Sequence, residues 1–156
     1  MSAQRRATVD PARAVAYDVL RATRDKDAYA NLLLPVLLRR RNLSGRDAAF
    51  ATALAAGTIR HLGSYDAILA TLVTRRLDDL QPALLDALRL GAHQMLQMRV
   101  PVHAAVATTV DLVSAQVGRG AAGLANAVLR RLGQHDLDGW LRRVAPDPAT
   151  DATGYA

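Results

Sequence analysis

The chain has 156 residues, enough for one domain with its own core, and its 20 basic and 14 acidic side chains give a net charge of +6 at pH 7. The absence of cysteine excludes disulfides, thiolate metal sites and a cysteine nucleophile, and is consistent with a reducing cytoplasm. Because no apolar run reaches the roughly 20 residues of a membrane span and no secretory signal is visible, we expect a cytoplasmic protein with no membrane partner.

Helical periodicity extends over nearly the whole sequence, which is rich in Ala and Leu and poor in β-branched and aromatic runs. We therefore predict an all-α fold, a compact bundle of about seven helices. Residues 1–9 are expected to form a flexible basic arm, 10–145 the helical domain, and 146–156 a linker or disordered tail. In chain order, the expected helices span about residues 11–24, 29–41, 45–61, 65–73, 82–98, 102–117 and 124–132, with a short eighth element at 137–144.

Local signals mark several of the helix ends. Asp10-Pro11 predicts a capped start, and Ser44–Asp47 resembles a capping box with Asp in place of the usual Glu. Pro35 lies inside the second helix and should kink or split it, because proline removes a backbone donor. Gly63-Ser64 is expected to separate the third and fourth helices, and Asp78-Asp79 is expected to cap the fifth.

The segment Gly118–Gly123 reads G-x-G-x-x-G, the pattern of a dinucleotide-binding turn, and Asp138 follows about 20 residues later. That fingerprint requires a strand before the glycines and a second strand after the helix. Residues 102–117 instead keep helical spacing, and no β-like run follows Leu132. We therefore interpret the segment as a turn between helices and expect no dinucleotide to bind there.

No arrangement of side chains typical of an active site is visible. The four histidines have neither the spacing of metal ligands nor a cysteine to complete a site; they are His61, His93, His103 and His135. We expect structural or surface roles for them, and we expect no metal.

Basic side chains, by contrast, gather at several places along the chain. Of the 20 basic residues only Lys26 is a lysine, and guanidinium groups pair well with phosphates and stack on bases. The clusters are Arg5, Arg6 and Arg13 near the start, Arg39–Arg41 at the end of the second helix, Arg130 and Arg131, and Arg142 and Arg143. A solvated face explains any one cluster, but together they favour an RNA-binding surface.

A series of segments then carries a family resemblance. They are Ala12–Leu20, Asp47–Phe50, Gly57–Arg60 followed by Asp66, Leu88–Leu96, Arg99–Val106 and Gly123–Arg130. In this order they resemble the NusB-type domain, over roughly residues 10–132. The resemblance implies an all-α, RNA-binding domain.

Two groups of proteins contain this domain. Free-standing NusB proteins are transcription antitermination factors, and the same domain begins the bacterial 16S rRNA cytosine-C5 methyltransferases of the RsmB, Fmu or Sun kind. This chain is more similar to the second group in Tyr29–Pro35, His103–Val106 and Asn126–Arg130, and it lacks the acidic Glu-Ala-Val of NusB proper. The alternative is a free-standing module for antitermination or protein interaction.

Methylation in the second group uses a cysteine thiolate and S-adenosylmethionine held in a Rossmann-like domain. This chain has no cysteine and no parallel-sheet pattern. The resemblance therefore implies that both belong to a catalytic domain outside this chain, so that the chain alone should be no enzyme and hold no cofactor. The implied partners are RNA, in particular 16S rRNA, and that catalytic domain. A second copy of the chain, in a weak homodimer, is a further alternative.

The resemblance also suggests which residues contact RNA. NusB proteins bind RNA through a basic arm that enters the first helix, and the residue-level match makes Arg13 the first candidate. Arg5 and Arg6 share the arm by position only. The further candidates are Arg119, Arg130 and Arg131.

Other residues of the matching segments have structural interpretations. We expect Arg60 and Asp66 to bridge the third and fourth helices. Asn126 should satisfy polar groups between packed helices, since buried amides need partners. Gly57 and Gly91 should permit close helix approach.

Overall fold

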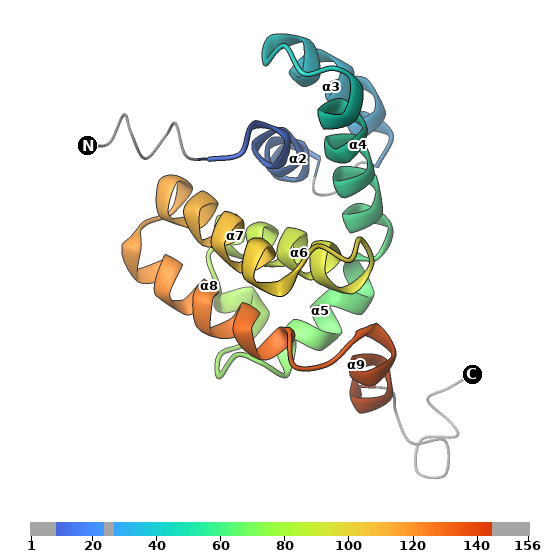
Figure 1. Ribbon diagram of the computed structural model, residues 1–156. Helices are drawn as coiled ribbons and strands as arrows, with labels where there is room; N and C mark the ends of the chain where they lie inside the picture. Colours follow the sequence, from blue (N-terminus) through green and yellow to red (C-terminus); the bar gives the residue numbers. More distant parts are fainter. Residues whose placement is uncertain (1–8, 24–26, 145–156) are drawn as a thin grey trace.

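The computed structural model describes residues 9–23 and 27–144, and within these ranges every regular element is a helix (Figure 1). The elements are α2 (Pro11–Ala22), α3 (Asp27–Arg40), α4 (Gly45–Arg60), α5 (Leu62–Ala70), the 3-10 helix η1 (Leu77–Asp79), α6 (Pro82–Leu96), α7 (Val102–Gln116), α8 (Arg119–Leu132) and α9 (Leu137–Val144). The predicted all-α class is confirmed. The predicted arm, except Val9, and the predicted tail lie outside the described residues.

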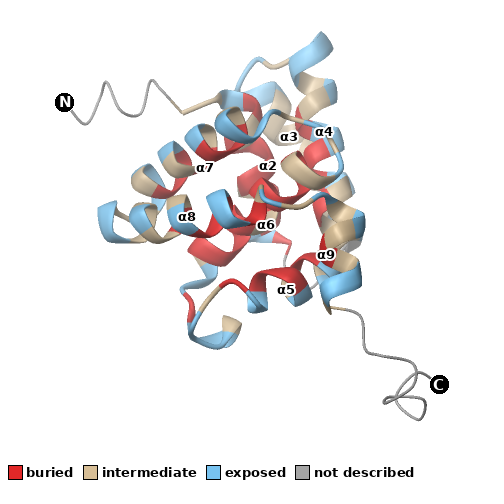
Figure 2. Ribbon diagram, turned by 60° about the horizontal axis from the view of Figure 1, so that its bottom comes forward, coloured by how far each residue is buried: buried red, intermediate tan, exposed pale blue. Residues whose placement is uncertain are grey.

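Helix α6 forms the centre of the bundle. It packs against α2, α4, α5, α7 and α8, and ten of its fifteen residues are buried (Figure 2). A helix that is buried on most of its circumference must be apolar nearly all round, which the sequence of α6 satisfies with Leu and Ala. The periodicity of the sequence predicted this helix correctly.

Helix α3 is attached to the bundle more loosely. It packs mainly on α2 and α4, and none of its residues with a described burial is fully buried. Its Leu32 side chain is 71% exposed and Tyr29 is 47% exposed. Beneath it lies a small apolar cluster of Ala12, Val15 and Ala51, separate from the main core.

The predicted caps are only partly correct. The Asp10 carboxylate accepts a hydrogen bond from the backbone N–H of Arg13 at 2.9 Å, so the start of α2 is confirmed. Ser44 occupies the N-cap of α4, but its side chain makes no capping bond, which contradicts the predicted capping box. The prediction for Asp78-Asp79 is also wrong, because both lie in η1 and the N-cap of α6 is Gln81.

Of two predicted interruptions, one does not split its helix and the other falls at a different residue. Helix α3 continues through Pro35 without splitting. Because Asn31, whose carbonyl loses its helical donor, is exposed, water can serve that carbonyl. The break between α4 and α5 lies at His61 rather than Gly63-Ser64, which form the first turn of α5, where N–H groups have no helical partner in any case.

The predicted turn over Gly118–Gly123 is confirmed only at Gly118, because α8 begins at Arg119. Gly118, which directly precedes α8, has a φ of +147°, a backbone conformation that residues other than glycine rarely adopt. Gly120 and Gly123 lie inside α8, where an added Cβ would meet no atom within 4 Å. The element before Gly118 is α7 and not a strand, so the context of a dinucleotide fingerprint is absent.

Two other glycines permit close contact with α6, as predicted. A Cβ on Gly57 would collide with the imidazole of His93. A Cβ on Gly91 would lie 2.8 Å from Leu129 Cδ2 and 3.2 Å from Thr109 Oγ1. These two positions bring α4, α7 and α8 against the central helix at short distance.

Charged side chains also join helices to α6. Asp86, which is 1% exposed, accepts hydrogen bonds from Arg21 of α2 at 3.1 Å and from Arg89 at 3.0 Å. Arg89 in turn binds both carboxylate oxygens of Asp66 at 2.7 Å. The predicted bridge between Arg60 and Asp66 is therefore wrong, because α6 supplies the arginine.

The prediction for Asn126 is also wrong. It is only half-buried and accepts a hydrogen bond from Arg130 Nε, one turn later on the same helix, at 3.2 Å. Near the end of the described chain, Trp140 secures α9 by donating from Nε1 to the Leu132 carbonyl at 2.7 Å. In the part of the chain that the structure describes, no helix is long and apolar enough to cross a membrane.

The close approach at Gly57 predicts opposite effects for two glycine substitutions. Gly57→Ala should lower the free energy of unfolding by about 2 kcal/mol, because the new methyl group overpacks the His93 ring. Gly123→Ala, in open space within α8, should raise it by up to about 1 kcal/mol through helix propensity. Urea unfolding followed by circular dichroism measures both, and equal effects would contradict the close contact.

Candidate nucleic-acid interface

Arg13, the first sequence candidate, is held by several partners near the start of α2. Its Nε donates to Gln94 Oε1 at 2.6 Å and its Nη1 to Asp10 Oδ2 at 3.1 Å. The guanidinium also lies 4.7 Å from the centre of the Phe50 ring, in a cation–π contact. Its side chain is only 16% exposed. Arg13 thus fastens the start of α2 to α4 and α6.

The candidates on α8 lie at the two ends of that helix. Arg119 is its first residue, and Arg130 and Arg131 are in its last turn, about 17 Å away at 1.5 Å per residue. All three are exposed. The turn before Arg119 lies on the same side of the molecule as the start of α2 in both views (Figures 1 and 2). Arg131 instead donates to the Leu72 carbonyl, just after α5, at 3.2 Å.

The sequence-predicted arginines therefore form two groups and not one patch. Arg13 lies near the start of the described chain, and the turn before α8 lies on the same side in both views (Figures 1 and 2). Arg130 and Arg131 belong to the end of α8 near α5. Arg5 and Arg6 lie outside the described residues.

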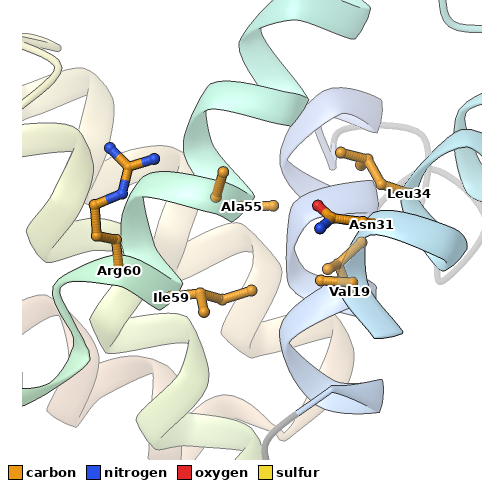
Figure 3. Close-up of a pocket in the computed structure, with 8 residues that line it drawn as sticks. Val19, Asn31, Leu34, Ala55, Ile59 and Arg60 are labelled. Carbon is orange, nitrogen blue, oxygen red and sulfur yellow. The ribbon is translucent and has the colours of Figure 1, made fainter. Parts of the chain in front are cut away.

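One pocket, of about 250 Å³, opens between α2, α3 and α4 (Figure 3). Val19, Asn31 and Leu34 face Ala55 and Ile59 across it, and Ala30 and Ala56 also line it. The Arg60 guanidinium points away from this space, so Arg60 borders the pocket with the rest of its side chain (Figure 3). The pocket is mainly apolar and suits a hydrocarbon group better than an anion.

A second pocket, of about 360 Å³, has a different character. It lies where α4 ends and α5 begins, with α9 on one side. Its lining residues are Arg60, His61, Gly63, Ser64, Tyr65, Gln97, Leu137 and Leu141. Half of them are polar and none is acidic. We call this space the polar pocket.

Behind the polar pocket, three aromatic side chains pack together. The ring centres of His61, Tyr65 and His93 lie 5.8–6.1 Å apart, and the Tyr65 hydroxyl is 2.6 Å from His93 Nδ1. Burial raises the pKa of Tyr65. Burial, together with the nearby charges of His61 and Arg60, lowers the pKa of His93 to about 4. His93 is therefore a neutral, structural histidine at pH 7, as the sequence suggested.

The sequence did not reveal the partners that decide these roles. Gln94 accepts a hydrogen bond from Arg13, and Asp86 accepts hydrogen bonds from Arg21 and Arg89. The residues that line the polar pocket come from three distant segments of the chain. A polar residue inside an otherwise apolar helix, such as Asp86, was the one signal that could have been used. Within residues 9–23 and 27–144 no group of three or more His, Asp or Glu side chains could hold a metal ion.

Comparisons with known proteins give a consistent result. A family model described as the NusB family matches residues 10–134. "Putative methyltransferase Rv1407" of Mycobacterium tuberculosis is 46% identical over 152 residues, 97% of this chain and 33% of that protein. "Ribosomal RNA small subunit methyltransferase B" of Thermus thermophilus is 40% identical over 123 residues, 79% of this chain and 30% of that protein. A protein of the same name from Proteus mirabilis is 32% identical over 119 residues, 76% of this chain and 28% of that protein.

The chain thus spans about a third of the length of the curated relatives that it matches. No solved structure matches it.

The lowered pKa of His93 predicts a loss of stability in acid. The unfolded chain binds a proton at His93 below its ordinary pKa of 6.5, whereas the folded chain does so only near 4. The stabilisation is therefore complete above pH 6.5 and lost as pH falls toward 4, by up to about 3 kcal/mol. Urea unfolding at a series of pH values measures this loss.

Two variants test the assignment to His93. His93→Gln cannot titrate and should lose most of this pH dependence, although its overall stability falls. His103→Gln, at an exposed position, should keep the pH dependence of the unmodified chain. If His93→Gln kept the pH dependence of the free energy of unfolding, the assignment to His93 would be ruled out.

Proposed function

Because this chain belongs to the NusB family, we propose that it is an RNA-binding domain that positions small-subunit ribosomal RNA for a methyltransferase domain of the same polypeptide. The observation that carries the proposal is its similarity, over most of its length, to about a third of proteins named ribosomal RNA small subunit methyltransferase B. We place the activity on 16S rRNA, at cytosine C5, and in the cytoplasm.

The chemistry of that reaction assigns this chain a binding role. Attack on a cytosine requires a thiolate nucleophile, and the chain has no cysteine. When bound elsewhere in the protein, S-adenosylmethionine supplies the methyl group. Positioning the RNA converts a loose encounter into an oriented one, which can account for a large part of an enzyme's rate.

We propose that RNA meets the side of the domain where the described chain starts. Arg5 and Arg6 are the proposed phosphate ligands of the arm, and exposed Arg119 follows the turn on that side of the molecule. Arg13 contributes mainly by fixing the start of α2, since two of its nitrogens already bind Asp10 and Gln94. Arg130 and Arg131 are proposed as a second, separate contact.

A second candidate function is a protein-interaction module, free-standing or in antitermination, or a weak homodimer. The exposed apolar side chains of α3, Leu32 and Tyr29, favour it, because such side chains at a surface often mark interfaces. It predicts binding that depends on Leu32 and is insensitive to salt.

RNA binding should be weak and strongly salt-dependent. If three phosphates of a single strand are neutralised, the slope of log K against log salt should be near −2, at about −0.7 per phosphate. The double variant Arg5→Gln/Arg6→Gln should weaken binding across RNA sequences and reduce the magnitude of the slope by about 1.4. Fluorescence anisotropy with labelled RNA at a series of salt concentrations measures both quantities.

A matched control removes the same charge elsewhere. Arg39→Gln/Arg40→Gln, at the exposed end of α3, should leave the slope unchanged. Equal losses in both double variants would indicate only a nonspecific charge effect. Salt-independent binding, or no effect of either pair, would favour the protein-interaction function.

A separate experiment tests whether this chain binds the RNA while another domain carries out the methylation. This chain alone should bind no S-adenosylmethionine in isothermal titration and transfer no methyl group to 16S rRNA. The full-length protein should do both, and removal of residues 1–144 should reduce its apparent affinity for rRNA while leaving cofactor binding intact. Full RNA activity after that removal would refute the positioning role.

A further inference from the structure

The polar pocket is lined by hydrogen-bonding side chains without protein partners. Arg60, His61, Ser64 and Gln97 make no side-chain hydrogen bond to another described residue and no ion pair. The arginines closer to the core differ, since Arg21 is paired with Asp86 and Arg89 with Asp66 and Asp86. Four hydrogen-bonding side chains of this one cavity are thus available to a ligand.

The charge of this pocket suits an anion. Its lining contains a guanidinium and no carboxylate. Burial is the main cause of the lowered pKa of His93 behind the pocket, and the nearby Arg60 guanidinium adds to it. A phosphate is the anion that a guanidinium binds most readily in nucleic acids, through charge-assisted hydrogen bonds.

The apolar part of the lining and the size of the cavity suit a second, apolar group. Leu137 and Leu141 of α9 line the pocket, and the half-buried ring of His61 borders it. A volume of about 360 Å³ is near the lower end for small-ligand sites, roughly 300–1,000 Å³. It therefore suits one nucleotide and excludes a duplex, whose bases are stacked inside.

We propose that the polar pocket binds a single unpaired nucleotide of RNA, with the phosphate on Arg60 and the base against Leu137 and Leu141. Proteins that recognise single-stranded RNA commonly take a splayed-out base onto aromatic or apolar side chains in this way. The inference rests on the proposed RNA-binding function. It adds a site from α4, α5 and α9 that is distinct from the arm and from Arg119.

The test uses the 156-residue chain and oligouridylate of about eight nucleotides, with an RNA duplex of equal length for comparison. In NMR spectra, the single strand should shift the backbone amide signals of Gly63 and Ser64, and the duplex should not. Arg60→Gln should abolish these shifts and weaken single-strand binding about tenfold, the effect of losing one charge-assisted hydrogen bond. Circular dichroism confirms that the variant is folded.

The matched control is Arg46→Gln, which removes the same charge from the opposite end of α4, where Arg46 is also exposed and unpaired among described residues. It should keep the Gly63 and Ser64 shifts and lose much less than tenfold in affinity. Equal losses in the two variants would overturn the assignment to the pocket.

The remaining outcomes separate this inference from the proposed function. Salt-dependent RNA binding without shifts at Gly63 and Ser64 would overturn the pocket and leave the domain an RNA-binding one. If the chain bound no RNA at all, both the pocket and the proposed RNA-binding function would be refuted. Uridine monophosphate should shift these signals at lower concentration than inorganic phosphate, and equal shifts would reduce the pocket to a simple anion site and overturn the nucleotide assignment.

Discussion

The fold depends on the burial of one helix, α6, by five others. Burying it is favourable only if its few polar groups find partners, because an unpaired buried charge is costly. Asp86 and Gln94 are satisfied from α2, and His93 by Tyr65 of α5. Each polar partner thus fixes how one helix meets α6. Gly57, against His93, and Gly91, against Leu129 and Thr109, allow the closest approaches to neighbouring helices.

The features that the sequence predicted well are those set by local periodicity. Apolar spacing located each α-helix of the described residues, although α8 begins five residues earlier than predicted, and small residues at Gly57 and Gly91 indicated close packing. The errors concern choices between partners that local sequence does not distinguish. The sequence suggested Arg60 as the partner of Asp66, but the mostly buried Arg89 of α6, 23 positions away, takes that place. Asp78-Asp79 had the composition of a cap, but the chain turns through η1 first, which places them three and two residues before the N-cap Gln81.

The candidate site was less predictable, for a related reason. Arginine clusters can be read from a sequence, but whether a guanidinium is free or already paired depends on distant residues such as Gln94, 81 positions from Arg13. Likewise the polar pocket combines residues 60–65, Gln97 and two leucines of α9. The sequence contains all of these side chains, and only the packing of α9 against α5 brings them around one cavity.

The peripheral position of α3 has a consequence for dynamics. Because α3 packs mainly on α2 and α4 and none of its residues with a described burial is fully buried, we expect it to detach more readily than the α6-centred core. Such sub-global opening sets the rate at which backbone amides exchange with solvent, and we expect those of α3 to exchange well before those of α6. Each opening would uncover the leucines of α3 together with Ala12, Val15 and Ala51. The part of the domain that we expect to open first thus also exposes apolar surface when it opens. Self-association on storage or heating should begin there.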